Sequence, residues 1–445
     1  MKKRTKRRKL RIKRVVLAII LLIIVSFLFI KSIVFNNYKS NIEEDVSDKI
    51  SIDEIVNNIV EYSNNEVDSK FLEWILNNYG EDVVVELEKR FKVGYSNNVW
   101  RSVTGDSFIV LNDKYNGLIS KDSNIKVVDE GNGRVSFVGD VSLADNWYII
   151  PEYDKREKGV YGILSDDVVE IMTNSSVMVA NNEFTISDRG EKLNNKLYTF
   201  RASPSRLSIY EEMGVDLVTL ANNHVYDFGV DAFYDTLSSL KEYNIPYIGA
   251  GKNLDEAMEP YYFVVNGYKI GFVNATRAEK FILTPGAGDN SPGVLRCYDP
   301  TNFIKVIENT KKVSDYVVAL VHWGKEDSFQ LESVQIETAK QYIDAGADLI
   351  IGSHAHNLQG IDFYNDKPII YNLGDFIFNH ETKDTAIFEF EVNDDGSLEY
   401  YFIPCKESNK YTSLLKDDDK LRVLEFMGNL SPNVIFETNG EFYSK

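Results

Sequence analysis

One pattern constrains this chain more than any other feature of its sequence. Apolar runs typical of buried strands end repeatedly in side chains that can bind metals. The pattern occurs at Asp140, Glu183, Asn223, His224, His322, His354 and His356. In α/β proteins the carboxyl ends of the strands form the binding crevice, so we expect these side chains to converge there. The pattern predicts an α/β fold with a polar site at one edge of its sheets.

The stretch from Gly133 onward alternates β-rich and helical runs, as α/β folds require. The expected strands are 135–138, 177–180, 217–220, 270–274, 316–321, 349–351 and 369–371. Helical stretches fall between several of these strands, for example at Val230–Tyr243 and Leu331–Ala345. The Gly- and Pro-rich segment Thr284–Gly293 lacks the Gly-Lys-Ser/Thr of a phosphate-binding loop, so we expect an ordinary loop there.

The histidines favour a metal site over a purely structural role. A single histidine is more often a hydrogen-bonded structural residue than a ligand. Here, however, four of the five histidines stand at equivalent strand ends, and only His380 does not. Imidazoles together with carboxylates suit Mn, Zn or Fe, and a bridging carboxylate suits a two-metal site. We therefore expect one or two divalent ions.

Each of these residue types suggests a role. The predicted metal ligands are Asp140, Glu183, Asn223, His322, His354 and His356. The His354-x-His356 spacing places both rings on one side if the turn between them is extended. His224 is adjacent to Asn223 and cannot easily share its metal. We therefore predict that His224 donates a proton or stabilises charge on a leaving oxygen.

Some acidic and amide side chains near these strand ends have simpler interpretations. Asp140 taken alone would be a turn cap, and Asn223 taken alone a turn residue. Asp227 precedes a predicted helix, so we interpret it as the helix N-cap and leave it out of the metal set. Asp375 follows the last predicted strand, and we expect it to orient a ligand histidine from outside the metal's own shell.

The N-terminal segment indicates a membrane anchor. The first 14 residues hold ten Lys and Arg and no acid, and Val15–Phe35 carries no charge except Lys31 near one end. A helix of this length crosses a bilayer core of about 30 Å, and the basic flank places the N-terminus in the cytoplasm. A cleaved signal peptide is the alternative, but no Ala-x-Ala site follows the apolar run. We predict a single-pass protein of the cell membrane whose bulk is extracellular.

Composition divides the chain into six segments. These are a basic cytoplasmic tail (1–14), the transmembrane anchor (15–35), a polar stalk (36–51), a small helical subdomain (52–130), the main domain (131–405) and a C-terminal extension that packs on it (406–445). Within the subdomain, Val99–Gly117 is predicted to form a hairpin or short strands around Thr104-Gly105-Asp106. No residue in the subdomain suggests chemistry.

Charge and cysteine content narrow the classes of partner. Without the basic tail, 39 basic residues face 68 acidic ones, a net charge of −29. Such a body is a poor nucleic-acid binder, since phosphate contacts need Lys and Arg. It also repels anionic polymers unless a local basic patch or bound cations intervene. The two cysteines, Cys297 and Cys405, either pair in an oxidising space or are two unpaired small residues.

Six ordered motifs resemble those of a known family. Gly139-Asp140, NNE ending at Glu183, TLANNHVYDFG, VHWG, GADLIIGSHAH and YNLGDFIF are similar to motifs of the bacterial capsule-synthesis CapA family, which takes part in poly-γ-glutamate biosynthesis. The similarity covers about Arg134 to Pro404. It implies a calcineurin-like metallophosphoesterase fold, a four-layer sandwich of two β-sheets flanked by helices. Carried over position by position, it implies the same six metal ligands, with His224 as the catalytic-type histidine.

The resemblance also implies a role and partners. The role is synthesis, export or attachment of poly-γ-glutamate or another anionic capsule polymer, at the membrane and beside other capsule-synthesis membrane proteins. Two positions depart from the pattern: Ser142 stands where metallophosphoesterases usually carry a histidine, and Asp375 stands where the last motif usually has Asn. Two alternative functions remain, a metal-dependent phosphoesterase or hydrolase of the cell envelope unrelated to capsule, and a non-catalytic polymer-binding scaffold.

Overall fold

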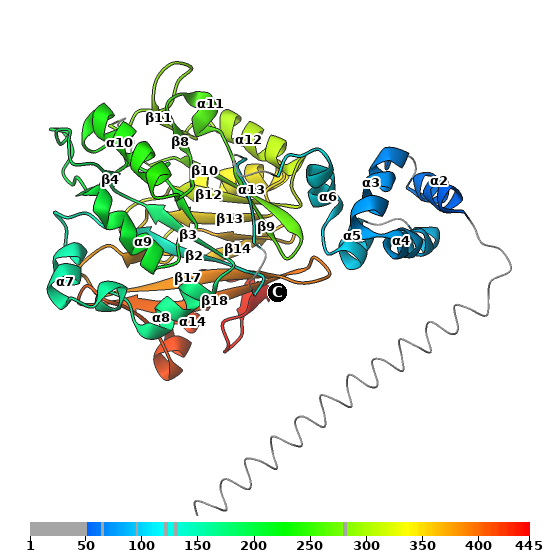
Figure 1. The fold of residues 1–445 in the computed structure, drawn as a ribbon. Coiled ribbons are helices and arrows are strands. Elements are labelled where there is room, and N and C mark those ends of the chain that lie inside the picture. Colours follow the sequence, from blue (N-terminus) through cyan, green and yellow to red (C-terminus); the bar gives the residue numbers. More distant parts are fainter. Residues whose placement is uncertain (1–50, 64–65, 95–96, 120–122, 129–131, 279–282) are drawn as a thin grey trace, which may run out of the picture. The chain divides into compact units, whose positions relative to one another are not determined.

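The computed structural model describes residues 51–63, 66–94, 97–119, 123–128, 132–278 and 283–445 (Figure 1). The predicted cytoplasmic tail and anchor, and the stalk up to residue 50, lie outside these ranges. Among the residues that are described, no helix has the length and apolar content needed to cross a membrane. The chain divides into two compact units, residues 1–73 and 74–445.

The first unit contains α2 (Ile52–Tyr62) and the start of α3 (Ser69–Tyr79). Ser51 caps α2, since its side chain accepts a hydrogen bond from the Glu54 N–H. Ile55, Val56 and Ile59 form the buried face of α2 at helical spacing. The stretch that was predicted to begin a small helical subdomain is therefore helical.

The second unit contains three further helices, and two of them lie where the sequence predicted a hairpin. They are α4 (Glu81–Val93), α5 (Asn97–Thr104) and α6 (Phe108–Tyr115). The predicted hairpin at 99–117 is wrong, because α5 and α6 occupy it with Gly105 at the turn between them. Trp100 of α5 packs against Phe91 at a ring-centroid distance of 5.1 Å. Tertiary packing of this buried ring outweighs the local preference of the short apolar runs for strands.

Two large sheets form the body of the second unit. One has seven strands in the order β1 (Ile125–Val127), β9 (Tyr261–Val265), β10 (Tyr268–Thr276), β12 (Tyr316–His322), β13 (Leu349–Ser353), β15 (Lys367–Ile370) and β14 (Ile361–Tyr364). The other has eight, in the order β19 (Thr412–Leu414), β18 (Leu398–Glu407), β17 (Lys383–Val392), β2 (Arg134–Val141), β3 (Val177–Asn182), β6 (Leu217–Thr219) and β7 (Tyr247–Ile248), with β16 (Asp375–Ile377) paired to β2. All seven predicted strands are present, as β2, β3, β6, β10, β12, β13 and β15.

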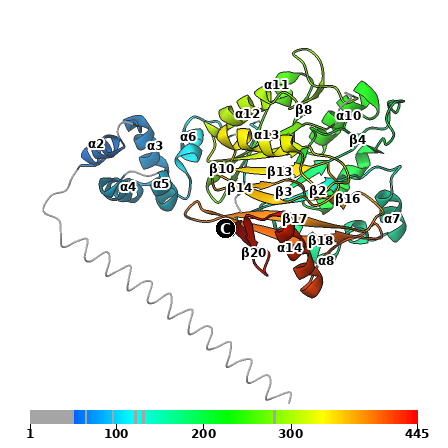
Figure 2. The same ribbon diagram turned by 180° about the vertical axis from the view of Figure 1, so that it is seen from behind.

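Helices cover the outer faces of the two sheets (Figures 1 and 2). The eight-stranded sheet is covered by α7 (Ile149–Arg156), α8 (Asp166–Asn174), α9 (Ser208–Glu212) and α10 (Gly229–Glu242). The seven-stranded sheet is covered by α12 (Thr301–Lys311) and α13 (Ser333–Asp344). Shorter elements connect them: η1 (Gly159–Gly162), β4 (Thr185–Ile186), β5 (Arg201–Ala202), η2 (Pro204–Leu207), β8 (Ala250–Gly251), α11 (Leu254–Ala257) and β11 (Gly293–Val294).

Alternation along the strands explains this layering. On β2, Phe137 faces the core between the two sheets and Val138 faces the helices, because successive side chains on a strand point to opposite faces. Phe272 of the other sheet lies 6.3 Å from Phe137, ring centroid to ring centroid. The result is a mixed α/β sandwich of helix, sheet, sheet and helix, and both faces of the central strands are apolar as buried parallel strands require.

The C-terminal residues extend this body. They form α14 (Asp417–Leu430), β20 (Val434–Phe436) and β21 (Phe442–Ser444), and Val423 and Met427 of α14 join the core between the sheets. The two cysteines are both free and buried. Cys297 belongs to the core under α12 and α13, and Cys405 to the core under α7–α10, so they lie in separate layers and do not pair.

Candidate metal centre

The predicted site residues meet where the parallel strands of both sheets end. Asp140 on β2 lies beside Asn181 on β3, and His322 on β12 lies beside Ser353 on β13. The glycines that precede two of these strand ends, Gly139 and Gly352, have a steric reason. At Gly352, for example, a side-chain Cβ would come within 1.9 Å of the Tyr371 carbonyl oxygen, so the close approach of neighbouring strands requires glycine.

Two buried carboxylates stand at the centre of the site. Asp140 and Glu183 are both fully buried. The Asn181 side-chain amide joins them, because its Nδ2 donates to Asp140 Oδ1 at 2.8 Å and to Glu183 Oε2 at 3.0 Å. The sequence analysis did not single out Asn181, although it lies in the same NNE motif as Glu183.

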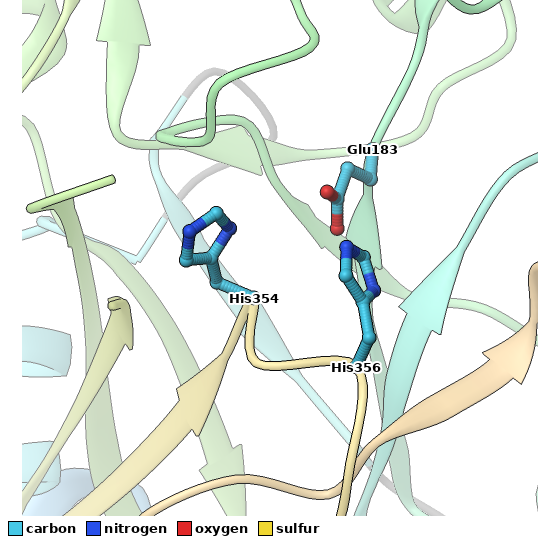
Figure 3. A group of neighbouring side chains, drawn as sticks. All are labelled: Glu183, His354 and His356. Atoms are coloured by element: carbon cyan, nitrogen blue, oxygen red, sulfur yellow. The ribbon is translucent and has the colours of Figure 1, made fainter. Parts of the chain in front are cut away.

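His354 and His356 face Glu183 (Figure 3). One ligand atom from each of the three residues lies within 4.8 Å of the others. The turn that brings them together is not extended, as the spacing argument assumed. His354 and His356 have φ of 95° and 57°, in the left-handed region. Residues other than glycine rarely adopt such φ values. Backbone positions with this strain cluster at functional sites.

His322 and Asn223 approach Glu183 from a second direction. His322 Nε2 lies 2.8 Å from Asn223 Oδ1 and 3.7 Å from Glu183 Oε1. Its other ring nitrogen, Nδ1, lies 2.8 Å from the Ser353 hydroxyl. Asn223 is buried with its amide oxygen directed at the histidine, so it does more than shape a turn.

Asp375 lies where the sequence analysis expected it, against a histidine of the site. The His356 Nδ1–H donates to Asp375 Oδ1 at 2.7 Å, and the same nitrogen lies 3.3 Å from Asp140 Oδ2. A carboxylate on Nδ1 leaves Nε2 of the ring for a metal, the usual arrangement around ligand histidines. Lys383, which the sequence analysis did not single out, lies 3.4 Å from Asp375 Oδ2.

The interpretation of Asp227 as a helix cap is wrong. The N-cap of α10 is Phe228, without a side-chain hydrogen bond. Asp227 Oδ2 instead accepts hydrogen bonds from His224 Nδ1 at 2.8 Å and from the Phe200 N–H at 2.7 Å. Lys196 Nζ lies 2.9 Å from Asp227 Oδ1 and also donates to the Asn223 carbonyl oxygen. His224 Nε2 is left 3.9 Å from Glu183 Oε1.

No local pattern in the sequence indicates that Lys196 belongs to the site. It lies 31 positions before Asp227, on a polar loop with no periodic pattern. A lysine in such a loop is normally solvated, whereas this side chain is only 7% exposed. Only the tertiary fold brings it to a buried carboxylate.

Burial controls the protonation of the site. Burial, followed by the charge of Asp140, raises the pKa of Glu183 well above its usual value. Burial also lowers the pKa of His354 to about 3 and holds the pKa of His322 well below the normal range. Burial opposes the charge on His356, but Asp375 and Asp140 outweigh it and raise the pKa of His356 well above normal. His322 and His354 are therefore neutral imidazoles, the form that binds metals.

The residues fit a divalent cation. Among the described residues, Glu183 Oε1 and His354 Nδ1 are buried atoms without a hydrogen-bond partner. Buried polar atoms without partners are rare in folded proteins, and an absent ion is one of their physical explanations. A positive charge beside Glu183 would also offset the repulsion between Glu183 and Asp140, which together with burial raises the pKa of Glu183. Ser142, at the position where the resemblance implies a histidine, is buried and offers only a hydroxyl.

The profile of the family described as "Bacterial capsule synthesis protein PGA_cap" matches residues 134–380, more than half of the chain. The chain belongs to this family. The match contains every strand end that contributes to the centre, from Asp140 to Asp375. The recognition made from the motifs is thereby confirmed.

Similar proteins from other bacteria have names that match this family. The "PGA biosynthesis protein CapA" of Bacillus subtilis strain 168 is 32% identical over 275 residues, 60% of this chain and 70% of that protein. The "Capsule biosynthesis protein CapA" of Bacillus anthracis is 33% identical over 210 residues, 46% of this chain and 50% of that protein. A "Probable polyglutamine synthesis accessory protein" of Mycobacterium tuberculosis is 28% identical over 217 residues, 47% of this chain and 57% of that protein.

Among solved structures, a hypothetical protein from Thermus thermophilus aligns with 61% of this chain and 99% of its own, with a TM-score of 0.37 and 16% identity. That likeness is too distant to bear on function.

Proposed function

We propose that this chain is a membrane-anchored, extracytoplasmic protein with a metallophosphoesterase-like centre, which acts in making, exporting or attaching an anionic capsule polymer such as poly-γ-glutamate. The family and the names of its relatives support the polymer. The observation that supports the centre is the convergence of buried Asp140, Glu183 and three histidines around atoms that have no partner among the described residues.

Glu183 is the residue that would serve both halves of a metal site. One group of candidate ligand atoms joins Glu183 with His354 and His356, and a second joins Glu183 with Asp140 and His322. A divalent ion bound there would supply Lewis-acid polarisation of a phosphoryl or carbonyl group. Because Ser142 stands where the resemblance implies a histidine, the group with Asp140 has one ring donor fewer than the family pattern. A single ion beside Glu183, the residue that the two groups share, is the minimum that the residues support.

His224 is the proposed proton donor. Its Nδ1–H is held by Asp227, which fixes the tautomer and presents Nε2 toward the centre. Lys196 balances the buried charge of Asp227. Phe200 packs on the His224 ring at a centroid distance of 4.4 Å and excludes water from that side. To act as the donor, His224 must carry a proton on both ring nitrogens; burial lowers its pKa, and the Asp227 carboxylate opposes that shift by stabilising the imidazolium. The imidazolium gives its Nε2 proton to the leaving oxygen or nitrogen of the substrate and keeps the Nδ1 proton, which is hydrogen-bonded to Asp227.

The anchor belongs to the proposal on sequence grounds alone, through Val15–Phe35 and the basic residues before it. Protease added to intact cells should remove the protein beyond the anchor while leaving the basic tail inside the cell. Protection of the whole chain from the protease would contradict the orientation.

The metal centre is tested first by elemental analysis of the purified full-length protein. We expect roughly one or two Mn, Zn or Fe ions per chain, reduced strongly in Glu183→Gln. The matched control is Glu326→Gln, because Glu326 is an exposed carboxylate whose Oε1 lies 4.0 Å from His354 Nε2. Absence of metal in the wild type, with no uptake of added Mn or Zn, would refute the metal centre.

Turnover is tested separately with His224→Ala. This variant should keep its metal and its thermal stability but lose capsule polymer production in cells and hydrolysis of phosphodiester or γ-glutamyl model substrates in vitro. Normal polymer production by a folded His224→Ala variant would favour the non-catalytic scaffold over the enzyme.

A further inference from the structure

Arg201 differs from most arginines of this acidic chain. Seven of the ten arginines in the described ranges form an ion pair with an Asp or Glu. Arg201 forms none with any described residue, although 68 acidic residues are available to it in the chain. The positive charge of Arg201 is therefore not neutralised by any described carboxylate of the protein.

The Arg201 guanidinium is held in place by neutral groups. Its central carbon lies 4.3 Å from the centroid of the Phe228 ring, a cation–π contact. Its Nη1 donates to the Gly190 carbonyl oxygen at 3.3 Å. Within the described part of the chain, Nε and Nη2 donate no hydrogen bond, so one planar edge of two parallel N–H donors remains for a ligand. That edge matches the two oxygens of a carboxylate.

Arg201 lines a pocket of about 420 Å³, within the range of small-ligand sites. Asn146, Thr199 and Lys192 also line it. Of its two acids, Asp145 is already neutralised, because it accepts hydrogen bonds from the Ser203 N–H and from Arg206 Nε, both at 2.7 Å. The other acid is the exposed Asp188. Two cations, Arg201 and Lys192, thus face one uncompensated carboxylate, which leaves the pocket positive.

The pocket lies next to the candidate metal centre. Phe200 contacts the His224 ring and donates its N–H to Asp227. The residues on either side of it, Thr199 and Arg201, both line the pocket. A polymer chain bound at the centre would therefore have its neighbouring unit within reach of Arg201.

We infer that the Nε–Nη2 edge of Arg201 is a substrate subsite, which binds a carboxylate on a neighbouring unit of a repeating polyanion whose reacting bond lies at the metal centre. The inference rests on the proposed function and deepens it. A body of charge −29 beyond the basic tail repels such a polymer, and a fixed local cation provides the attraction that the surface as a whole lacks. The assigned ligand is a carboxylate because the polymer of the proposed function carries one on each unit and the free edge can bind it through two parallel N–H groups.

The test measures binding of a labelled γ-linked glutamate pentamer to the full-length protein in detergent, both chelator-treated and with Mn²⁺. Arg201→Met should weaken binding on the order of 10-fold or more, since it removes a charge-assisted bidentate contact. Arg201→Lys should recover part of the loss, and Lys192→Met, on an exposed side chain, should weaken binding by a smaller factor. The matched control is Arg189→Met, because Arg189 lies in the segment between β4 and β5 but is engaged by Asp235.

Three outcomes would overturn the inference. The first is equal affinity of wild type and the Arg201 variants, with folding verified by circular dichroism. The second is no binding of the pentamer by wild type. The third is tighter binding of a glycerol-phosphate oligomer than of the glutamate pentamer. Because binding is compared in the chelator-treated protein as well, a protein without metal refutes the proposed centre yet still reports on Arg201.

Discussion

Glu183→Gln should make the metal-free protein more stable, although it destroys the proposed centre. The Glu183 carboxyl is fully buried beside Asp140, and burial with that neighbouring charge raises its pKa well above the ordinary 4.5. The folded protein therefore holds a proton that the unfolded chain releases. Stability from this group is complete below pH 4.5 and is lost as pH rises toward the raised pKa.

The ordinary pKa fixes the size of the effect. At pH 7, about 2.5 units above 4.5, keeping the proton costs up to about 3 kcal/mol at 1.36 kcal/mol per unit. Glutamine has nearly the same shape and no proton to hold, so the variant avoids this cost. Addition of metal should reverse the order, because ligand at 100 times its dissociation constant stabilises the wild type by about 2.7 kcal/mol.

The assay is thermal unfolding by tryptophan fluorescence, between pH 5 and pH 7.5, in EDTA and in saturating Mn²⁺. In EDTA the variant should melt above the wild type at pH 7, and the gap should close toward pH 5. Glu326→Gln, at an exposed carboxylate, should change neither curve. A Glu183→Gln protein that melts below wild type in EDTA at pH 7 would show that Glu183 is not a strained, proton-holding group, and the argument for a missing cation would fail.

Three further predictions concern the surroundings of the centre. Asp227→Asn removes the carboxylate that pairs with buried Lys196 and should cost about 3–5 kcal/mol of stability; adding Lys196→Met should recover most of the melting temperature, and no recovery would contradict the pairing. Asp375→Asn should weaken metal binding about 10- to 100-fold in a chelator competition, whereas unchanged affinity would separate this carboxylate from the site. Burial raises the pKa of Cys297 to about 11 and of Cys405 to about 12, so a disulfide-exchange reagent at pH 8 should label neither thiol until the protein unfolds, and rapid labelling of the native protein would contradict their burial.

The strand ends show which parts of the fold and the site a local sequence pattern can predict. Each predicted strand is present, because a buried central strand needs an unbroken apolar run, and such runs stand out in sequence. The six predicted ligands lie together because parallel strands bring their carboxyl ends to one edge. The left-handed turn at His354 and His356 could not be predicted, since neither residue is one that usually adopts positive φ.

The two wrong predictions, the hairpin at Val99–Gly117 and the helix cap at Asp227, have a common physical cause. Val99–Gly117 is helical because Trp100 packs into a core built by residues of other helices. Asp227 looked like a cap because its neighbours in sequence begin a helix, but its actual partners, His224, Lys196 and Phe200, arrive from separate segments. Local preferences are a few tenths of a kcal/mol per residue, and burial of one ring or one charge exceeds them.

By itself, the sequence determined the family, the order of the predicted ligands along the chain and the chemical type of each, since these follow from residue identity and spacing. Only the tertiary structure decided what surrounds them. It placed Lys196 and Asp227 behind His224, put Asp375 and Lys383 behind His356, and left two N–H groups of Arg201 without a hydrogen-bond partner among the described residues. These are contacts between segments distant in sequence, and their energies depend on burial, which no local pattern records.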